Sequence, residues 1–370
     1  MKKTWVLLAL VFAFGGTSVY AGDGSAKALD IVTVTTPATD RKENVLTVDE
    51  AVKKAIDYSP TLKTLSENNV LNEVEADDTH TDLVWATEYV EVTNLNVEFK
   101  NLMKSIKNYD TNVEIQKEKI RLNVIELFAG IISAEDNVSM YEEQLELNER
   151  ELKIAQVKKS LGLMSDSEYN ALVVDNNSLK NSKQSIEAAL TQAYISLNRL
   201  LGQNVDTKYT VELNIDYEPL GQVDLDYEMI KASTSSQTIK ELEDAAEIAQ
   251  YQVDVYSSEY SNDKKEAKEN NLSQATRNLS DAKAEMAANV KNTYNSIQTA
   301  ENTYTNNLAT LEQQKKELEI KKLQLSSGKI TRLEYDKAEH SIKELENTIR
   351  QGVYSHYILV CKFNNPDLIS

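Results

Sequence analysis

Apolar side chains recur along this chain at alternating spacings of four and three residues. Between positions 120 and 155 the seam comprises Ile120, Val124, Leu127, Ile131, Ala134, Val138, Tyr141, Leu145, Asn148, Leu152 and Ala155. The same spacing resumes from Leu172 to Leu200. A sustained seven-residue repeat predicts helices that pack as coiled coils. The break at 159–166 contains a glycine, so we predict a tight turn that folds the two helices into an antiparallel hairpin.

The second half of the chain repeats this plan. A seam of the same spacing, in which we place Lys315 and Lys322, leads from Val290 to the next break, and a return seam follows it. The two breaks read KSLGLMSDSEY (159–169) and SSGKITRLEY (326–335), so that Gly162 matches Gly328. We therefore predict a duplicated chain with hairpin tips near these glycines. Polar residues interrupt both seams, which favours helices packed side by side in a larger ring.

Composition divides the chain into four segments. Residues 1–21 carry two lysines, then the apolar run WVLLALVFAF, and end on alanine, which is typical of a signal peptide and predicts export. Residues 22–44 are rich in threonine and predict an extended or disordered lead-in. We assign 45–218 to a first repeat, with a helix break at its proline, and 219–370 to a second. Residues 202–224 are interpreted as the linker between the two halves, and TVELNI within them is a candidate for a short strand.

Charge and chemistry exclude several functions. The formal net charge is -19, which argues against binding nucleic acid or anionic lipid headgroups. Cys361 is the one cysteine and lies in an apolar run, where a buried small side chain is expected. We expect His80 in a loop, His340 on the surface and His356 in a helix. None has a partner at metal-ligand spacing, and no phosphate-binding or nucleophile motif is present, so we expect no metal, no cofactor and no enzyme.

These features resemble the TolC-like outer-membrane efflux family. The resemblance covers about residues 45–365 and is carried by LTVDEAVKKAIDYSPTLK, by the two glycine tips and by the ending AYISLNRLLG, together with the export signal. It implies a homotrimer whose helical hairpins form a hollow duct below an outer-membrane barrel. It also implies docking of a periplasmic adaptor that belongs to an inner-membrane transporter.

The sequence departs from the family where barrel strands belong. Residues 256–285 show none of the alternating hydrophobicity that a lipid-facing strand of about 9–11 residues needs. YVEVTNLNVEF (89–99) does alternate, but it also fits a helical seam, which we favour. We therefore predict an all-α fold of two tandem hairpin repeats with little or no barrel. Short polar loops at 76–82 and 261–271 would replace the strands.

The tips are the first candidate site. As the resemblance implies, an adaptor would meet Leu161, Gly162, Leu163, Ser327, Gly328 and Lys329. Glycine permits a left-handed turn and close backbone approach, and an exposed leucine offers an apolar contact. The alternative is that each glycine merely ends a helix, which duplication alone would preserve.

Acidic residues just beyond the tips are the second candidate site. In the family, acids in this zone ring the narrow end of the duct, and here they would be Asp166, Glu168, Glu334 and Asp336. Repeated in each copy, they would attract cations and repel anions. The alternative is that they favour the N-termini of their helices. Lys337 adds a positive charge near the second tip.

Two functions remain open at this stage. The first is a TolC-like efflux component that forms a helical periplasmic duct for the export of small molecules or proteins. The second is an exported coiled-coil scaffold or spacer of the cell envelope with no transport role. The tip motifs favour the first, and the missing strands favour the second. A periplasmic binding or sensor module is a weaker third, because no apolar pocket can be inferred from the sequence.

Overall fold

The computed structural model describes residues 33–34, 45–260 and 264–369. The signal-peptide segment and nearly all of the extended lead-in lie outside the described residues. Eight α-helices make up most of the described chain: α1 (Val48–Tyr58), α2 (Pro60–Trp85), α3 (Tyr89–Ser160), α4 (Asp166–Leu200), α5 (Leu225–Ser235), α6 (Gln237–Asp254), α7 (Lys265–Ser326) and α8 (Arg332–Asn364). A 3-10 turn, Pro366–Leu368, follows α8. The predicted all-α fold is confirmed.

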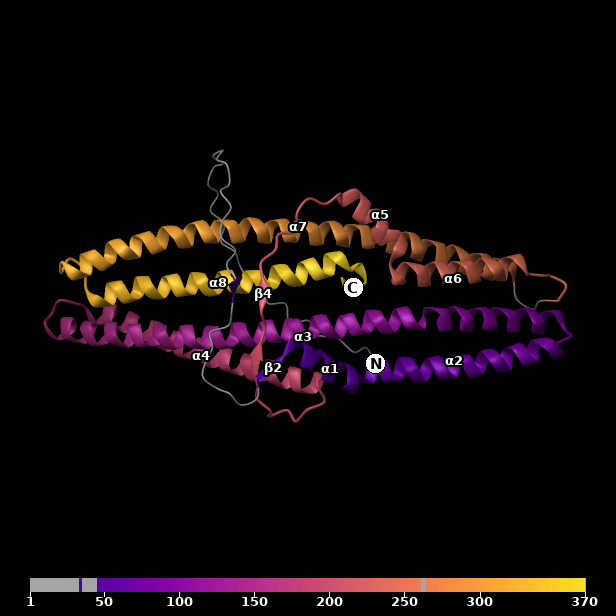
Figure 1. The fold of residues 1–370 in the computed structure, drawn as a ribbon, viewed down its shortest axis with the longest axis horizontal. Helices are drawn as coiled ribbons and strands as arrows, with labels where there is room; N and C mark the ends of the chain where they lie inside the picture. Colours follow the sequence, from indigo (N-terminus) through magenta and orange to yellow (C-terminus); the bar gives the residue numbers. More distant parts are fainter. Residues whose placement is uncertain (1–32, 35–44, 261–263, 370) are drawn as a thin grey trace. The chain divides into compact units, whose positions relative to one another are not determined.

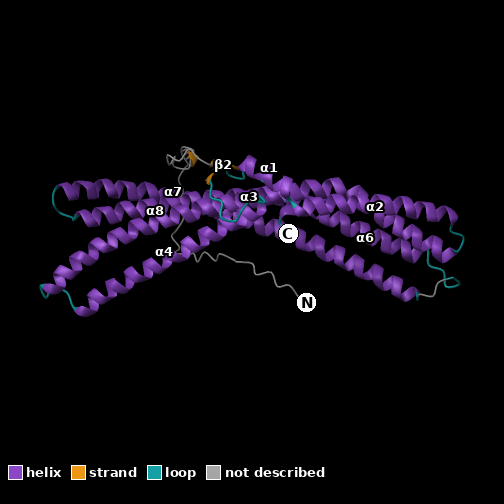
Figure 2. Cartoon of the chain, turned by 90° about the horizontal axis from the view of Figure 1, so that it is seen from below, coloured by secondary structure: helices purple, strands orange, loops and turns teal. Residues whose placement is uncertain are grey.

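Four short strands lie among the described residues (Figure 2). They are β1 (Thr33–Val34), β2 (Val45–Thr47), β3 (Thr210–Glu212) and β4 (Ile215–Asp216). β2 pairs in parallel with β3, and β1 pairs antiparallel with β4. The strand expected at TVELNI is therefore present, divided into β3 and β4.

The two long hairpins pack side by side through their inner helices. α3 packs against its hairpin partner α4 and also against α8, and α8 packs against α7. Figure 1 shows the resulting order α7, α8, α3, α4, which leaves α4 and α7 at the two edges of the layer. α3 has 72 residues, so at about 1.5 Å per residue it is on the order of 100 Å long.

Local signals start and stop these helices. Thr47 and Glu50 form a capping box at the start of α1. Ser59 then caps α2, whose first residue is Pro60, so the expected break at the proline is confirmed. In the middle of the chain, α1, α3, α4 and α8 enclose one apolar core. Phe128, Ile131 and Leu197 are fully buried there.

The seam predictions hold except in the last turns of α7. Lys315 and Lys322 are exposed, whereas Gln314 and Lys321 are half-buried. After Leu311, the positions that face inward therefore follow at intervals of three and then four residues, as in the corresponding part of α3. The physical reason is that a lysine ammonium stays hydrated when it lies outside the helix contact. Lys315 lies there and pairs with a carboxylate of α8 at 2.7 Å.

The two loops predicted in place of strands are wrong. Residues 76–82 lie inside α2, and the turn comes later, at 86–88. Residues 265–271 form the start of α7, whereas 261–263 lie outside the described residues. The helical interpretation of 89–99 is confirmed. The prediction took polarity as a sign of a loop. A polar segment can still form a helix, because a half-exposed helix packs only one of its faces against its neighbour. Within the described ranges, no helix has the length and hydropathy needed to cross a membrane.

Candidate docking tips and the contact between hairpins

Both tips have the same backbone structure. Gly162 and Gly328 each have φ of 70° directly after the end of a helix. The amide of Leu163 donates to the carbonyl of Lys158 over 2.8 Å, and the amide of Lys329 donates to that of Gln324 over 2.8 Å. The amides of Gly162 and Gly328 each donate to the carbonyl three residues earlier. Together, the two bonds at each tip form a Schellman motif. The glycines therefore do end their helices, and they also turn the chain sharply at the tip.

The six residues predicted for adaptor docking are all exposed. Leu161 is 67% and Leu163 is 74% exposed. Ile154 and Val157 extend this apolar surface up the same side of α3. The second tip presents Ser327 and Lys329 at the positions of the two leucines, with exposed Ile320 and Leu323 on α7 matching the pair on α3. The two tips thus share a backbone but differ in chemistry.

Two of the four predicted aperture acids serve as capping residues. Glu168 accepts a hydrogen bond from the amide of Ser165 over 2.8 Å, and the hydroxyl of Ser165 accepts one from the amide of Glu168. Glu334 and Thr331 make the same reciprocal contacts at the second tip. The hydrogen bonds from Ser165 lower the pKa of Glu168, and those from Thr331 lower that of Glu334. Both carboxylates remain exposed, so each keeps a solvated negative charge at its tip.

The other two aperture acids differ from one another. Asp166 is largely exposed and pairs with Lys159 at 2.9 Å. Asp336 is only 12% exposed and is held by Arg150 of α3 at 2.6 Å and by Arg332 at 2.7 Å. Asp336 therefore joins the two hairpins. The sequence predicted that these acids lie near the tips. It could not predict the contact of Asp336 with the other hairpin, because the partner of Asp336 on α3 lies far away in sequence.

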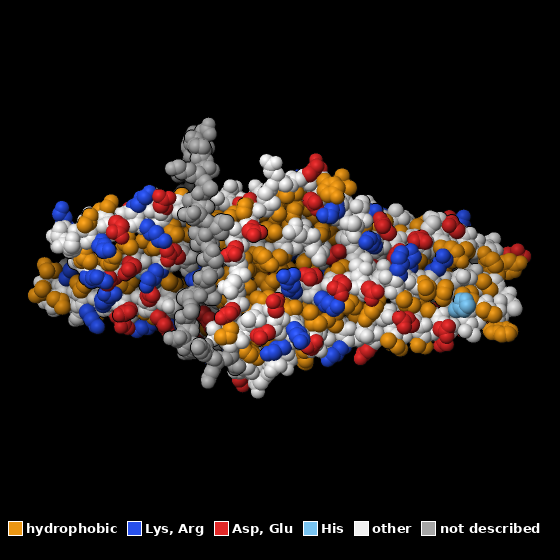
Figure 3. Space-filling view, in the orientation of Figure 1, with side chains coloured by type: hydrophobic (Ala, Val, Ile, Leu, Met, Phe, Trp, Pro, Cys, Tyr) orange, Lys and Arg blue, Asp and Glu red, His pale blue; other side chains and the backbone are white. Residues whose placement is uncertain are grey.

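Charged pairs continue along the contact of α3 with α8. Glu151 pairs with Lys337 at 2.6 Å, and Asp136 pairs with Arg350 at 2.8 Å. Burial raises the pKa of Asp136, and the nearby Arg350 acts in the opposite direction. The outer faces of the helices carry mixed charges, as Figure 3 shows for one side. The contact between the hairpins therefore combines these ion pairs with the apolar core that α3 and α8 share in the middle of the chain.

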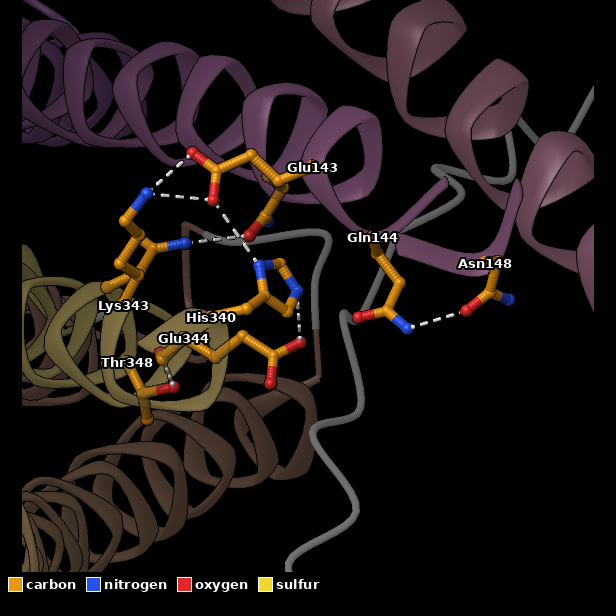
Figure 4. Close-up of polar contacts among 9 residues, drawn as sticks. Glu143, Gln144, Asn148, His340, Lys343, Glu344 and Thr348 are labelled. Carbon is orange, nitrogen blue, oxygen red and sulfur yellow. Dashed lines mark hydrogen bonds and ion pairs between the residues drawn. The ribbon is translucent and has the colours of Figure 1, made fainter. Parts of the chain in front are cut away.

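His340 lies at the centre of this contact (Figure 4). Its Nδ1 is 3.5 Å from a carboxylate oxygen of Glu143 on α3, and its Nε2 is 3.3 Å from one of Glu344 on α8. Lys343 donates to both oxygens of Glu143 at 3.0 Å. Burial raises the pKa of Glu143, but the hydrogen bonds from Lys343 and His340 outweigh it and lower that pKa. A charged imidazole ring could donate to both glutamates at once.

The surface position predicted for His340 is wrong, because its side chain is 4% exposed. His80 lies in α2 and not in a loop, whereas His356 is helical as predicted. Sequence reasoning missed the His340 contact because Glu143 is nearly two hundred positions away. Cys361 is half-buried, and burial raises the pKa of its thiol. Among the described residues, no group of three or more acids, histidines and cysteines is placed to hold a metal ion.

No family model matches the sequence, and no curated protein does either. Solved structures do match. CmeC, an outer membrane channel of Campylobacter jejuni, has a TM-score of 0.63 at 11% identity, over 87% of this chain and 85% of that chain. VceC, an outer membrane protein of Vibrio cholerae, has a TM-score of 0.60 at 9% identity, over 85% of this chain and 94% of that chain.

The match extends to the open state of MtrE, an outer membrane channel of Neisseria gonorrhoeae, with a TM-score of 0.54 at 11% identity. It covers 92% of this chain and 96% of that chain. The chain has the fold of these outer-membrane channels. The likeness inferred from the sequence is therefore confirmed at the level of fold, and it covers most of this chain.

Proposed function

We propose that this protein is a TolC-like efflux component of the bacterial cell envelope. Copies of the chain, three in number, assemble into a helical duct in the periplasm or at the outer membrane. The tips dock a periplasmic adaptor of an inner-membrane transporter, which supplies the energy for export. The duct performs no chemistry of its own. The fold shared with outer-membrane channels supports this proposal.

The observation that carries the proposal is the pair of tips. Residues 45–218 and 219–370 act as two repeats, and each presents an exposed glycine turn of the same geometry. Leu161, Leu163 and the neighbouring apolar face of α3 expose more apolar surface than a solvated turn requires. An α-helical partner with an apolar stripe would cover these side chains. A scaffold or spacer has no need for them.

The tip acids give the duct a preference for cations. Asp166, Glu168 and Glu334 are exposed and would place negative charge near the narrow end in every copy. Asp336 contributes little to this field, because two arginines pair with it. The capping role of the glutamates does not compete with this function, since a capping carboxylate stays charged.

The test is photo-crosslinking in living cells from a probe at position 163, with mass spectrometry of the captured proteins. The control carries the probe at Tyr227, which is 59% exposed but lies on α5, away from the tips. Capture of an adaptor subunit from position 163 and not from position 227 supports docking. Capture of only further copies of the chain or of cell-wall components would favour the envelope scaffold.

A further inference from the structure

A cleft of about 400 Å³ lies among α2, α3 and α6. α3 packs against both of the other helices, and Figure 1 shows α2 and α6 at the end opposite the tips. At about 1.5 Å per residue, the stretch of α3 from Asn112 to Ser160 separates the cleft from the first tip by on the order of 70 Å. Sites for small ligands have volumes of about 300–1,000 Å³, so the cleft is large enough to be one.

Amide side chains dominate the lining of this cleft. Asparagines from both α2 and α3 line it, namely Asn68, Asn69, Asn72, Asn101, Asn108 and Asn112. On α3, Ser105 completes a row whose spacings from 101 to 112 are four, three and four residues. This is the spacing of the coiled-coil seams, but the row carries polar groups where a seam carries apolar side chains. Such a row gains little from packing against another helix, so it remains available to a polar ligand.

Part of this hydrogen-bonding capacity is unused. Within the described residues, the side chains of Asn68, Asn72 and Asn101 make no hydrogen bond. Asn69 donates through Nδ2 to Glu73 over 2.7 Å, which leaves its Oδ1 as a buried acceptor without a donor. Buried polar atoms are rarely left unpaired in folded proteins. The cleft therefore offers amide donors and acceptors that the rest of the described chain does not occupy.

Charged residues of the cleft hold two further amides in place. Nδ2 of Asn108 donates to Asp244 over 3.2 Å, and Nδ2 of Asn112 donates to Glu241 over 2.8 Å. These bonds use the nitrogen of each amide and leave its oxygen to accept from a ligand. Lys104 of α3 pairs with Asp244. Among the described residues that line the cleft, one lysine stands against two carboxylates, which disfavours an anionic ligand.

We propose that this cleft binds a neutral oligosaccharide, laid as a short strand along α3. A sugar hydroxyl both donates and accepts hydrogen bonds, and an asparagine amide matches both roles without carrying a charge. Tyr109 also lines the cleft and supplies an aromatic surface on which a sugar ring can stack. The site goes beyond the proposed duct and does not depend on it, because one chain contains all of these residues.

The spacing of the polar row favours a glycan over a peptide. Along α3 the row advances by one helical turn, about 5.4 Å, from each residue to the next. That distance is close to the length of one pyranose unit in an extended, β-linked strand. An extended peptide brings a side chain back to the same face only after two residues, about 6.8 Å. The row from Asn101 to Asn112 therefore matches about three sugar units.

Calorimetric titration of the purified protein with two sugars tests the site. The probes are β-linked tetramers of N-acetylglucosamine and of glucose, and we expect a dissociation constant on the order of 1 mM or tighter for at least one of them. Tighter binding of the N-acetylglucosamine tetramer would support a glycan strand of the cell-wall type, and equal or tighter binding of the glucose tetramer would support a soluble saccharide. No binding of either sugar at concentrations on the order of 10 mM, or tighter binding of a tetrapeptide with blocked ends, would overturn the proposal.

Variants on α3 locate the binding. Asn101→Ala removes an exposed amide of the cleft, so we expect the affinity for the sugar to fall about threefold to tenfold with the fold unchanged. Ser105→Trp should fill the cleft and lower the affinity by about tenfold or more, while helical circular dichroism stays the same. Asn123→Ala, which removes an exposed amide of α3 outside the cleft, is the control and should leave the affinity unchanged. Unchanged affinity in both cleft variants, or an equal loss in the control, would place the binding elsewhere and overturn the proposal.

Discussion

Arg150 of α3 donates a hydrogen bond to Asp336 of α8 over 2.6 Å, across 186 positions of sequence. This pair joins the two hairpins close to their tips. Arg332, also on α8, forms a second ion pair with the same carboxylate. The aspartate is nearly buried, whereas Arg150 is 41% exposed at its side chain. The contact therefore links the tip geometry of one repeat to that of the other.

Removing the charge of Asp336 should loosen this link. Asp336→Asn leaves Arg150 beside a neutral amide, and we expect unfolding to become easier by about 1–2 kcal/mol. Urea denaturation followed by helical circular dichroism measures the change. Glu312→Gln, which breaks an exposed pair within α7, is the control and should have no measurable effect. Equal losses of stability in the two variants would show that the pair of Arg150 and Asp336 contributes no more than an exposed pair within one helix.

Alanine at the tip glycines should strain the backbone. Gly162→Ala and Gly328→Ala must hold φ of 70°, so each should destabilise the fold by about 1 kcal/mol. No heavy atom lies within 4 Å of the added methyl group at either site, so the cost is conformational and should be equal at both. Gly130→Ala, inside α3 and equally open, should instead stabilise by about 0.5–1 kcal/mol. Denaturation midpoints check the opposite signs.

The contact of Glu143 with Lys343 and His340 should respond to acid. The pKa of Glu143 is lowered in the fold from 4.5, so its contribution is fully present above that value. It is lost as the pH falls through the lowered pKa. The stability gap between the wild type and Glu143→Gln should therefore be largest near neutral pH and close in acid. Glu146→Gln, on the exposed side of the same helix, is the control. A gap that widened in acid would refute the assignment.

Asn198 should be required for the loop that follows α4. Its side chain is fully buried, and its Nδ2 donates to the carbonyls of Val205 and Thr207 over 3.0 and 2.7 Å. Asn198→Ala removes both hydrogen bonds from the carbonyls of Val205 and Thr207, so we expect a loss of about 1–3 kcal/mol. Thermal unfolding measures it. Asn181→Ala, an exposed position in the same helix, should change stability little. A small effect at position 198 would mean that water replaces the amide.

Much of the fold was predictable because it is local. Heptad spacing predicted the long helices. The capping boxes of α4 and α8 were not predicted, although serine or threonine three residues before glutamate is the local signal for them. The tip glycines fitted a left-handed turn, as their φ values show. The errors arose where polarity alone or spacing alone was used. Residues 76–82 are polar but continue a helix, and Lys315 lies outside the seam in which spacing had placed it.

The sequence by itself determined the hairpins, their tips and their duplication, because periodicity, caps and turn residues act between neighbours a few positions apart. Only the tertiary structure decided which helices meet. The burial of His340 and the pairing of Arg150 with Asp336 depend on α3 lying against α8. Partners separated by almost two hundred residues leave no local signal, since either face of an amphipathic helix with polar seams could have been the one that packs.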